Sequence, residues 1–289
     1  MSTSSPTRVG ILYLVATPIG NLGDLSPRVQ ETLASVDLIL AEDTRRTRNL
    51  LTHMGLQRNL ESYHRHTERE KAERYLNMLL SGTTLALVSD AGVPVISDPG
   101  AHITLLAHEA GISVIPIPGP SAVMTALSVS GFNADSFTFR GYPPVKTNDR
   151  QKFFKSCAQL PHPVVLFEAP HRIKESLVDA VTVFGADRQA FVAREMTKQF
   201  EEYRRGKLAE LEQHFTQTDP LGEFTFIIGP DPISEDNVIL APVQTDEIIQ
   251  LLLETQVPTK KAAAILAAAT GIGRREAYQL MLQAGQSEE

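Results

Sequence analysis

Three loops rich in glycine, proline and small polar residues could carry chemistry in this chain. They span Thr17–Asp24, Ser89–Pro94 and Pro118–Ala122. Each follows a short apolar run typical of a buried strand, and ligands bind beyond the carboxyl ends of strands in open α/β sheets. Glycine lets the backbone approach a ligand closely, while Asp90 and Ser121 can hydrogen-bond hydroxyl or amino groups. The alternative is that all three loops are ordinary tight turns.

The familiar signatures of other sites are absent from the sequence. No Gly-x-Gly-x-x-Gly follows the first apolar run and no Gly-Lys-Ser/Thr occurs, which argues against the common dinucleotide and nucleoside-triphosphate sites. His64 and His66 are a weak metal signal because no third ligand is evident. A surface loop is the favoured interpretation there, and no metal is expected.

Charged residues follow the second apolar run, at Ala41–Arg46. Glu42 or Asp43 could accept a proton, and Arg45 or Arg46 could contact a phosphate. The same residues also suit the start of a helix, with Asp43 as the N-cap and solvated charges beyond it.

Two further charged segments end apolar runs in the second half, at Phe167–Arg172 and Arg194–Lys198. Charge clustered at the ends of buried strands favours a lined cleft. The alternative is that Glu168 with Arg172, or Glu195 with Lys198, forms a structural ion pair.

Alternating strands and helices must position these loops. Helical spacing or capping predicts helices near Ser26–Ser35, Thr44–His53, Thr67–Leu80, Ala101–Ala110, Ser121–Val129, Asp149–Gln159, Arg172–Phe184 and Leu208–Phe215. Short apolar runs predict strands at Ile11–Ala16, Asp37–Ala41, Leu85–Val88, Val114–Ile117, Phe137–Phe139, Pro163–Phe167, Gln189–Ala193 and Glu223–Ile228. This alternation predicts parallel pairing and the α/β class.

The predicted organisation is two α/β domains, 1–120 and 121–230, followed by a helical tail over 238–289. A Pro- and Gly-containing acidic stretch predicts a linker before the tail. Three short helices are expected in the tail, at Thr245–Glu254, Thr259–Ala269 and Gly273–Leu282. The last two have helix–turn–helix spacing and carry the basic residues Lys260, Lys261, Arg274 and Arg275. This hairpin either contacts RNA or is a solvated element packed on the body.

Composition limits the class of protein. The 289 residues include 34 acidic and 27 basic side chains, for a net charge of −7, which counts against a protein that coats nucleic acid through bulk charge. The single cysteine, Cys157, excludes an internal disulfide and fits a cytoplasmic protein. No apolar run approaches the roughly 20 residues of a membrane helix.

Six motifs occur in order along nearly the whole chain. They are Thr17–Asp24, Ala41–Arg45, Leu87–Gly92, Asp98–Gly100, Pro118–Ala122 and Ala193–Lys198. This set resembles the tetrapyrrole methylase superfamily, and more narrowly its branch that modifies ribosomal RNA. The first loop lacks the Gly-x-Gly-Pro-Gly-Asp pattern of porphyrin-type members, which favours the ribosomal RNA branch.

The resemblance implies an S-adenosylmethionine (SAM)-dependent homodimeric enzyme with its cofactor cleft between two α/β domains. Its implied activity is 2′-O-methylation of a cytidine in 16S rRNA (cytidine 1402 in the family), as RNA or within the 30S subunit. The implied cofactor contacts are Pro18, Asp90, Ala91, Gly92, Ser121, Ala122, Phe167, Ala193 and Thr225.

The reaction needs a group that takes the hydroxyl proton and a group that stabilises developing negative charge. Glu42 or Asp43 is the expected proton acceptor, Arg45 a phosphate contact, and Lys198 or Arg194 the stabilising cation. The alternatives are a methylase of a corrinoid or porphyrin precursor, and a non-catalytic RNA-binding protein on the same scaffold. The first loop and the basic tail speak against the former, and the intact cofactor loops against the latter.

Overall fold

The computed structural model describes residues 9–218, 221–230, 245–255, 257–270 and 273–286. They fall in two compact units, divided between residues 232 and 233. The first unit holds both sheets and the second holds helices alone. This agrees with the α/β class and helical tail predicted from the sequence. The predicted boundary near residue 120 stays a prediction, and residues 231–244 of the predicted linker and tail lie outside the described residues.

The first sheet is fully parallel, with strand order β3-β2-β4-β1-β5. Its strands are β1 (Ile11–Val15), β2 (Leu38–Ala41), β3 (Leu60–Ser62), β4 (Leu85–Val88) and β5 (Ser113–Ile117). Four of them lie where apolar runs predict strands. The short β3 was not predicted, because its three half-buried residues have no apolar run.

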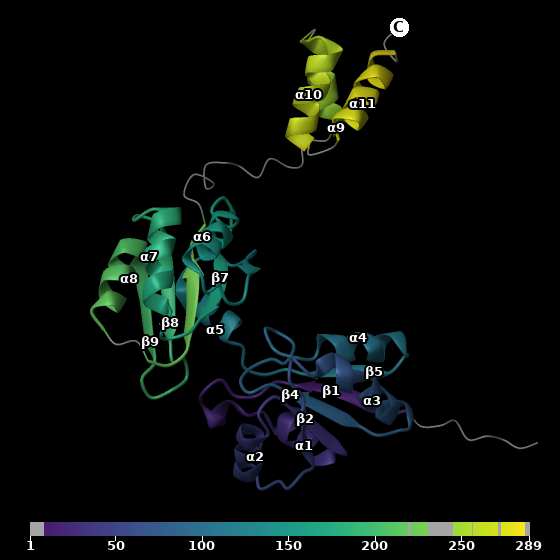
Figure 1. Cartoon of the computed structure of the whole chain (residues 1–289), viewed down its shortest axis with the longest axis vertical. Helices are drawn as coiled ribbons and strands as arrows, with labels where there is room; N and C mark the ends of the chain where they lie inside the picture. The colour runs from purple at the N-terminus through teal and green to yellow at the C-terminus, as the bar shows by residue number, and fades with distance from the viewer. Residues whose placement is uncertain (1–8, 219–220, 231–244, 256, 271–272, 287–289) are drawn as a thin grey trace, which may run out of the picture. The chain divides into compact units, whose positions relative to one another are not determined.

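Helices cover both faces of the first sheet. One face packs against α1 (Pro27–Ser35) and α2 (Thr44–His53). The other face packs against α3 (Glu68–Leu80) and α4 (Ala101–Glu109) (Figure 1). The central strands β2 and β4 are therefore buried on both faces, which explains their continuous apolar sequence. This sheet brings the carboxyl ends of β1, β2 and β4 to one edge.

The second sheet is mixed, with strand order β6-β7-β10-β8-β9. Its strands are β6 (Thr138–Phe139), β7 (Val164–Glu168), β8 (Gln189–Arg194), β9 (Glu202–Lys207) and β10 (Phe224–Ile228). The prediction of parallel pairing was wrong here. The last strand, β10, inserts between β7 and β8 and runs antiparallel to both, and a short loop returns β9 antiparallel to β8.

One face of the second sheet packs on three helices, and the other packs on one. The three are α6 (Thr147–Lys155), α7 (Ile173–Phe184) and α8 (Leu208–Thr216), with Phe154, Leu177 and Phe215 in the core. The opposite face receives Val123 and Leu127 from α5 (Ala122–Ser130). Because α5 is short, part of that face is left to loops, which form the candidate site described below.

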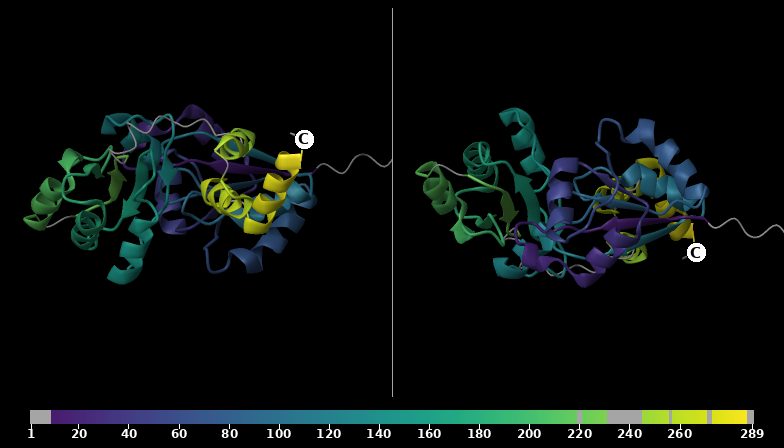
Figure 2. Two further views of the ribbon diagram at one scale, coloured as in Figure 1. Left: turned by 90° about the horizontal axis from the view of Figure 1, so that it is seen from above. Right: turned by 90° about the horizontal axis from the view of Figure 1, so that it is seen from below.

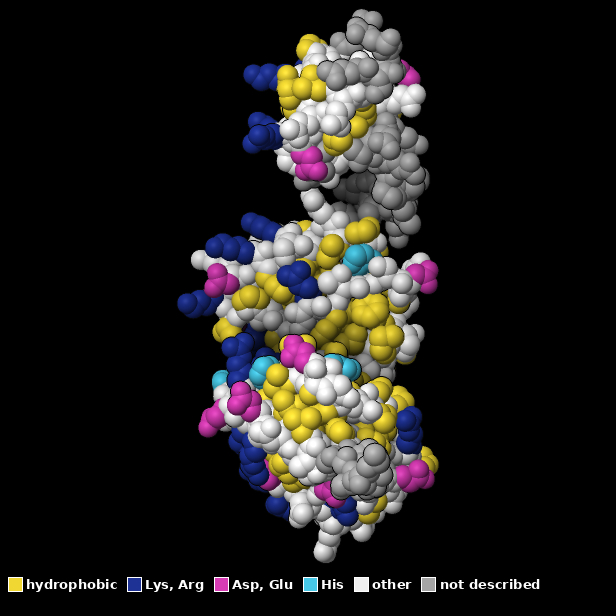
Figure 3. All heavy atoms as spheres, turned by 90° about the vertical axis from the view of Figure 1, so that its right-hand side faces the viewer, with side chains coloured by type: hydrophobic (Ala, Val, Ile, Leu, Met, Phe, Trp, Pro, Cys, Tyr) yellow, Lys and Arg dark blue, Asp and Glu magenta, His cyan; other side chains and the backbone are white. Residues whose placement is uncertain are grey.

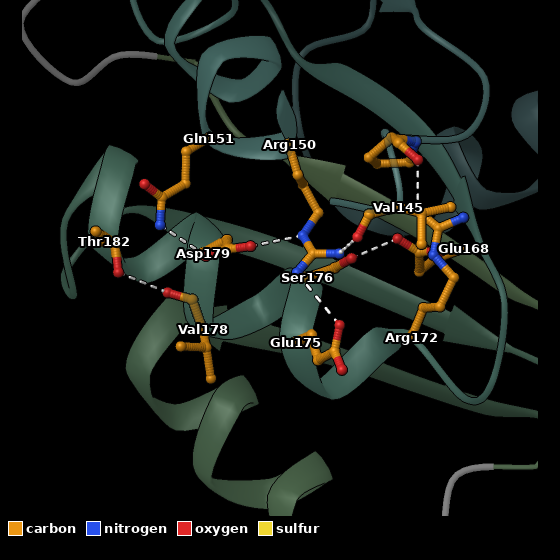
Figure 4. Close-up of polar contacts among 11 residues, drawn as sticks. Val145, Arg150, Gln151, Glu168, Arg172, Glu175, Ser176, Val178, Asp179 and Thr182 are labelled. Atoms are coloured by element: carbon orange, nitrogen blue, oxygen red, sulfur yellow. Dashed lines mark hydrogen bonds and ion pairs between the residues drawn. The ribbon is translucent and has the colours of Figure 1, made fainter. Parts of the chain in front are cut away.

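A buried ion pair joins α6 to α7 (Figure 4). The Arg150 side chain is 1% exposed, and its Nε donates to Oδ2 of Asp179 at 2.6 Å. Gln151 donates to the other carboxylate oxygen of Asp179 at 2.8 Å, and Arg150 also donates to the Val145 carbonyl at 3.0 Å. Each buried charge is therefore compensated, which the low dielectric of the interior requires.

The second unit is a bundle of three helices, α9 (Thr245–Glu254), α10 (Thr259–Thr270) and α11 (Arg274–Gln286) (Figures 1 and 2). Its core contains Ile249, Leu266 and Met281. The bounds match the predicted tail helices closely, while Gly271 of the predicted turn lies outside the described residues. Within the described part of the chain, no helix is long and apolar enough to cross a membrane.

We predict that Asp179→Ala destabilises the protein by about 3–5 kcal/mol, because it leaves the Arg150 charge buried without its partner. Urea unfolding followed by circular dichroism measures this loss. The matched control is Glu175→Ala. This carboxylate lies 3.4 Å from Arg150 but is 67% exposed, so its removal should cost no more than about 1 kcal/mol. Equal losses in the two variants would contradict the assignment.

Candidate functional site

A cavity of about 330 Å³ lies where loops of the two sheets meet in the first unit. The lining includes seven of the nine residues predicted to contact the cofactor: Asp90, Ala91, Gly92, Ser121, Ala122, Phe167 and Thr225. Pro18 lines a second cavity alongside, and Ala193 is fully buried in β8, paired with Thr225. The seven lining residues come from four separate segments of the sequence, which therefore converge on one space.

The loops after β1 and β4 are bridged at the edge of this cavity. Thr17 and Gly92 exchange two backbone hydrogen bonds, of 2.9 and 3.0 Å. The hydroxyl of Thr17 donates to the Ser89 carbonyl at 3.1 Å, and the Ser89 hydroxyl donates to the Gly92 carbonyl at 3.0 Å. Gly92 has a φ of +82°, a conformation that glycine adopts without strain.

The first loop also touches the loop after β8. A Cβ atom on Gly20 would lie 2.5 Å from Cγ of Lys198 and 2.7 Å from Oγ1 of Thr197. Only glycine allows this approach, which is closer than real Cβ contacts come. Gly20 is thus the point at which a loop of the first sheet meets a loop of the second, beside the cavity-lining Met196.

Four residues other than glycine have a left-handed backbone in the described part of the chain. They are Val95, Ser97, Glu195 and Thr197, with φ between +51° and +76°. All four lie in the two loops that carry the cavity-lining residues Ser97 and Met196. This conformation is strained, most of all for β-branched side chains, so tertiary contacts must impose it.

Carboxylates gather at the first-sheet side of the cavity. Asp90 accepts a hydrogen bond from the Asp43 backbone at 2.9 Å and lies 3.5 Å from the Arg46 guanidinium. Burial and the neighbouring Glu42 raise the pKa of Asp98 to about 6, although the polar Ser89 side chain opposes the shift. Burial and the Asp90 charge likewise raise the pKa of Glu42. The site thus holds carboxyl groups whose affinity for a proton is above the ordinary range.

Asp98 was not among the predicted site residues. The signal was present, because its Asp-Pro-Gly motif is one of the six that carry the family resemblance. Its chemistry depends on Glu42 and Asp90, which are distant in sequence and close only in the fold.

The predicted catalytic residues occupy different environments. Asp43 caps α2 by accepting the Arg45 backbone N–H at 2.8 Å, and pairs with the Arg45 side chain at 2.9 Å. These hydrogen bonds lower the pKa of Asp43, and Arg45 is 86% exposed. Both therefore match the helix-start alternative. Glu42 lies beside Asp90 and Asp98, but it is outside the lining of the two cavities.

Lys198 lies at the second-sheet side, where Nζ donates to Glu195 at 2.7 Å and to Glu223 at 3.0 Å. Burial by itself would lower the pKa of Lys198, but these two carboxylates raise it. The ammonium group is therefore charged and paired, next to the cavity-lining Glu223. Arg194 pairs with Glu202 at 3.3 Å.

Glu168 lines the cavity and also makes the structural contacts drawn in Figure 4. The residue is 2% exposed, lies 3.3 Å from Arg172 Nε and accepts a hydrogen bond from the Ser176 hydroxyl. Arg172 in turn donates to the Pro143 carbonyl, next to the cavity-lining Tyr142. The ion pair considered from the sequence is therefore present, and it fixes two segments of the wall. Within the described residues, no group of three or more His, Cys, Asp or Glu could hold a metal ion.

Comparison with known proteins adds to this geometry. The family Tetrapyrrole (Corrin/Porphyrin) Methylases matches residues 11–212, which hold nearly the whole first unit. The chain belongs to the tetrapyrrole methylase family. Residues 240–285 match a second family, the RsmI C-terminal HTH domain.

Tetrapyrrole methylase relatives of similar length share a more specific name, Ribosomal RNA small subunit methyltransferase I. The relative from Xylella fastidiosa (strain Temecula1) is 45% identical over 269 residues, with 93% of this chain and 98% of the relative covered. The relative from Synechocystis is 44% identical, with 95% of this chain and 98% of the relative covered. The relative from Vibrio cholerae is 41% identical, with 96% of each chain covered. The chain is a member of this group.

Solved methyltransferase structures show the same fold at low identity. The methyltransferase CobJ has a TM-score of 0.58 at 15% identity, with 76% of this chain and 94% of that chain covered. Uroporphyrin-III-C-methyltransferase from Thermus thermophilus has a TM-score of 0.54 at 16% identity, with 79% and 98% covered. These matches establish the arrangement of the two sheets.

We predict that Asp98→Asn stabilises the protein at pH 8 and not at pH 4. The folded-state pKa of Asp98 is raised to about 6, so its contribution to stability is present at low pH and is lost as the pH rises through about 6. Asparagine removes this loss because it carries no charge. Urea unfolding at the two pH values measures the effect.

The control is the same substitution at Asp135, an exposed loop residue outside the cavity lining. A gain at pH 8 that is equal in both variants, or absent from Asp98→Asn, would contradict the prediction.

Proposed function

We propose that the chain transfers a methyl group from SAM to the ribose 2′-hydroxyl of a cytidine in small-subunit ribosomal RNA, cytidine 1402 of 16S rRNA in the family. The observation that carries the proposal is the cavity in which seven predicted cofactor residues meet. The relatives named for ribosomal RNA cover 93–96% of the chain at 41–45% identity. The first loop, Thr17–Asp24, lacks the Gly-x-Gly-Pro-Gly-Asp pattern of porphyrin-type members, which favours the RNA substrate.

The residues of the cavity suit SAM. Its volume of about 330 Å³ is within the usual range for small-molecule sites. Apolar walls from Ile19, Phe167 and Met196 suit an adenine ring and a methylene chain, while Asp90 and Asp98 suit hydroxyl, amino and sulfonium groups. When bound, SAM supplies a methyl group on a positively charged sulfur, which a hydroxyl oxygen can attack.

The carboxylates beside the cavity provide the proton acceptor. Of the two acceptors predicted from the sequence, Glu42 suits the role better, because its pKa is raised and it lies near Asp98 and Asp90. Asp43 is held ionised by Arg45 and engaged in the helix cap. Asp98 adds a carboxylate in the cavity lining itself. We therefore assign proton removal to Glu42 and Asp98 acting together, and charge stabilisation at the opposite side to Lys198.

Two basic regions are proposed to hold RNA. The first is the start of α2, with Arg45, Arg46 and Arg48. The second is the C-terminal unit, on one side of which Figure 3 shows two separate groups of Lys and Arg side chains. They come from the first turns of α10 and α11: Lys260, Lys261, Arg274 and Arg275. Cations at the positive ends of helix dipoles lower the stability of the helices. They also add to the positive potential at these ends, which suits phosphate binding.

We also propose that the chain forms a homodimer and acts in the cytoplasm. Exposed apolar side chains on α5 and around β9 support the dimer. Met124 and Val129 of α5 are 55% and 51% exposed, and Phe200 and Tyr203 near and on β9 are 70% and 40% exposed. Large apolar side chains exposed to this extent are typical of protein interfaces. An RNA substrate and an unpaired Cys157 suit the cytoplasm.

We expect a strain that lacks the gene to lose one 2′-O-methyl group from its small-subunit ribosomal RNA, and the wild-type gene to restore it. Mapping of ribose methylation by reverse transcription at low nucleotide concentration checks this. Ala122→Phe should fail to restore the group because the larger side chain fills the cofactor cavity. Its affinity for SAM, measured by calorimetry, should fall at least about tenfold. The control is Ala186→Phe at an exposed position, and an unchanged methylation map in the deletion strain would refute the proposed function.

We predict that the single-turnover rate of methyl transfer rises with pH through about 6, as Asp98 loses its proton, and is level above pH 8. Replacing the acceptor group with an amide should lower the level rate by about 10²–10⁴-fold, so Glu42→Gln and Asp98→Asn should both be slow. Asp43→Asn should retain the rate, since asparagine also caps helices. If Glu42→Gln and Asp98→Asn both keep the wild-type rate, Glu42 and Asp98 are excluded as proton acceptors.

A further inference from the structure

A second cavity, of about 310 Å³, adjoins the cofactor cavity. It lies between the loop after β1 and the helix α2. The lining includes Pro18, Leu22, Thr47, Asn49 and Leu50. Only Arg46 and Asp90 line both cavities, so two occupants would meet across these two side chains.

Two polar side chains of the second cavity, those of Thr47 and Asn49, make no hydrogen bond to the described residues. Thr47 is 3% exposed, and its hydroxyl makes no hydrogen bond to any described residue. By contrast, Thr52 of the same helix donates to the Arg48 carbonyl at 2.8 Å. The Asn49 amide is also without a partner among the described residues. Asn49 is exposed and the Thr47 hydroxyl is not among the fully buried unpaired atoms, so both groups are open to hydrogen bonds from a molecule in the cavity. This pair therefore suits a ligand with hydrogen-bonding edges.

The remaining walls favour a flat, partly apolar ligand attached to phosphates. Pro18, Leu22 and Leu50 supply apolar surface, and Leu22 is 44% exposed. The first two turns of α2 carry Arg46 and Arg48 and no acidic side chain in the first turn. The positive end of the helix adds to these charges. The opening of the cavity is therefore suited to anionic groups.

We propose that this second cavity receives the acceptor nucleoside, a pyrimidine turned out of its stack in single-stranded RNA. Thr47 and Asn49 bind the polar edge of the base, and the apolar walls contact its faces. The ribose lies toward Arg46 and Asp90, where the 2′-hydroxyl faces the methyl donor, and the flanking phosphates contact Arg46 and Arg48. This inference rests on the proposed function and names the residues that select its substrate.

The chemistry of RNA favours this arrangement. Sequence-specific recognition of RNA targets unstacked bases, whose Watson–Crick edges are free for hydrogen bonds. Enzymes that modify a nucleotide commonly turn it out into a pocket, because its reactive group is otherwise out of reach. The volume of the cavity accommodates one nucleoside, so the rest of the RNA must lie outside on the basic surface.

Thr47→Val and Asn49→Ala test the proposal, with Thr52→Val as the matched control on the same helix. The probe is an RNA hairpin that carries the mapped methylation site, with the fluorescent analogue pyrrolo-cytidine at the acceptor position. Wild-type protein without SAM should increase the fluorescence of the analogue, because the base leaves its stack. The two cavity variants should lose most of this increase and bind the RNA about tenfold more weakly, which corresponds to about 1.4 kcal/mol. Their affinity for SAM and their folding should be unchanged.

Steady-state kinetics separates binding from chemistry. In the cavity variants the KM for RNA should rise about tenfold while kcat changes less than about threefold, and Thr52→Val should resemble the wild type. This inference alone would be overturned if the wild-type protein methylates RNA and both cavity variants give the same fluorescence increase and the same KM as the wild type. A wild-type protein that methylates no ribosomal RNA would overturn the proposed function, and the inference with it.

Discussion

Two hydrogen bonds between the backbones of Thr17 and Gly92 set the geometry on which the rest of the site depends. They form an isolated antiparallel bridge beyond the carboxyl ends of the parallel strands β1 and β4, and this bridge holds the two loops together at that edge. Pro18 is next to Thr17 in the chain, and Asp90 lies just before Gly92, so the bridge positions both residues. Pro18 lines the second cavity, and Asp90 lines both cavities. A buried pair of peptide groups held in this way is costly to break, so the loops behave as part of the sheet.

The two sides of the first cavity, which is lined by loops of both sheets, are held by different physical means. The first-sheet side depends on backbone hydrogen bonds and on two glycines. A Cβ atom at Gly20 would clash with Lys198 and Thr197, and Gly92 has a φ of +82°, which would strain another residue. The second-sheet side depends on buried charge, because Glu168 and Arg172 connect the end of β7 to the segment at Pro143. Buried ion pairs add little net stability, but they specify geometry well, which suits a wall that must keep its shape.

The parts of the fold that could be predicted are those determined by local sequence. The buried strand Leu38–Ala41 and the capped helix from Pro27 were placed within a few residues, because apolar runs and capping residues act locally. The strand Glu202–Lys207 was missed because it is a polar edge strand, and the antiparallel insertion of β10 leaves no local signal. In the site, the sequence indicated which loops converge. The proton affinity of Asp98 could not be predicted, since it comes from burial and from Glu42.

The left-handed backbone at Val95, Ser97, Glu195 and Thr197 has a consequence for how the protein can be changed. Glycine at these positions would remove steric strain, so selection for thermal tolerance alone should accumulate such replacements in the cavity loops. Native chains generally keep strained residues only where the surrounding structure or the function requires them. A heat-resistant variant evolved in the laboratory under selection for activity would therefore be informative. The strained positions that stay unaltered in it would be those in loops that must keep their shape for activity.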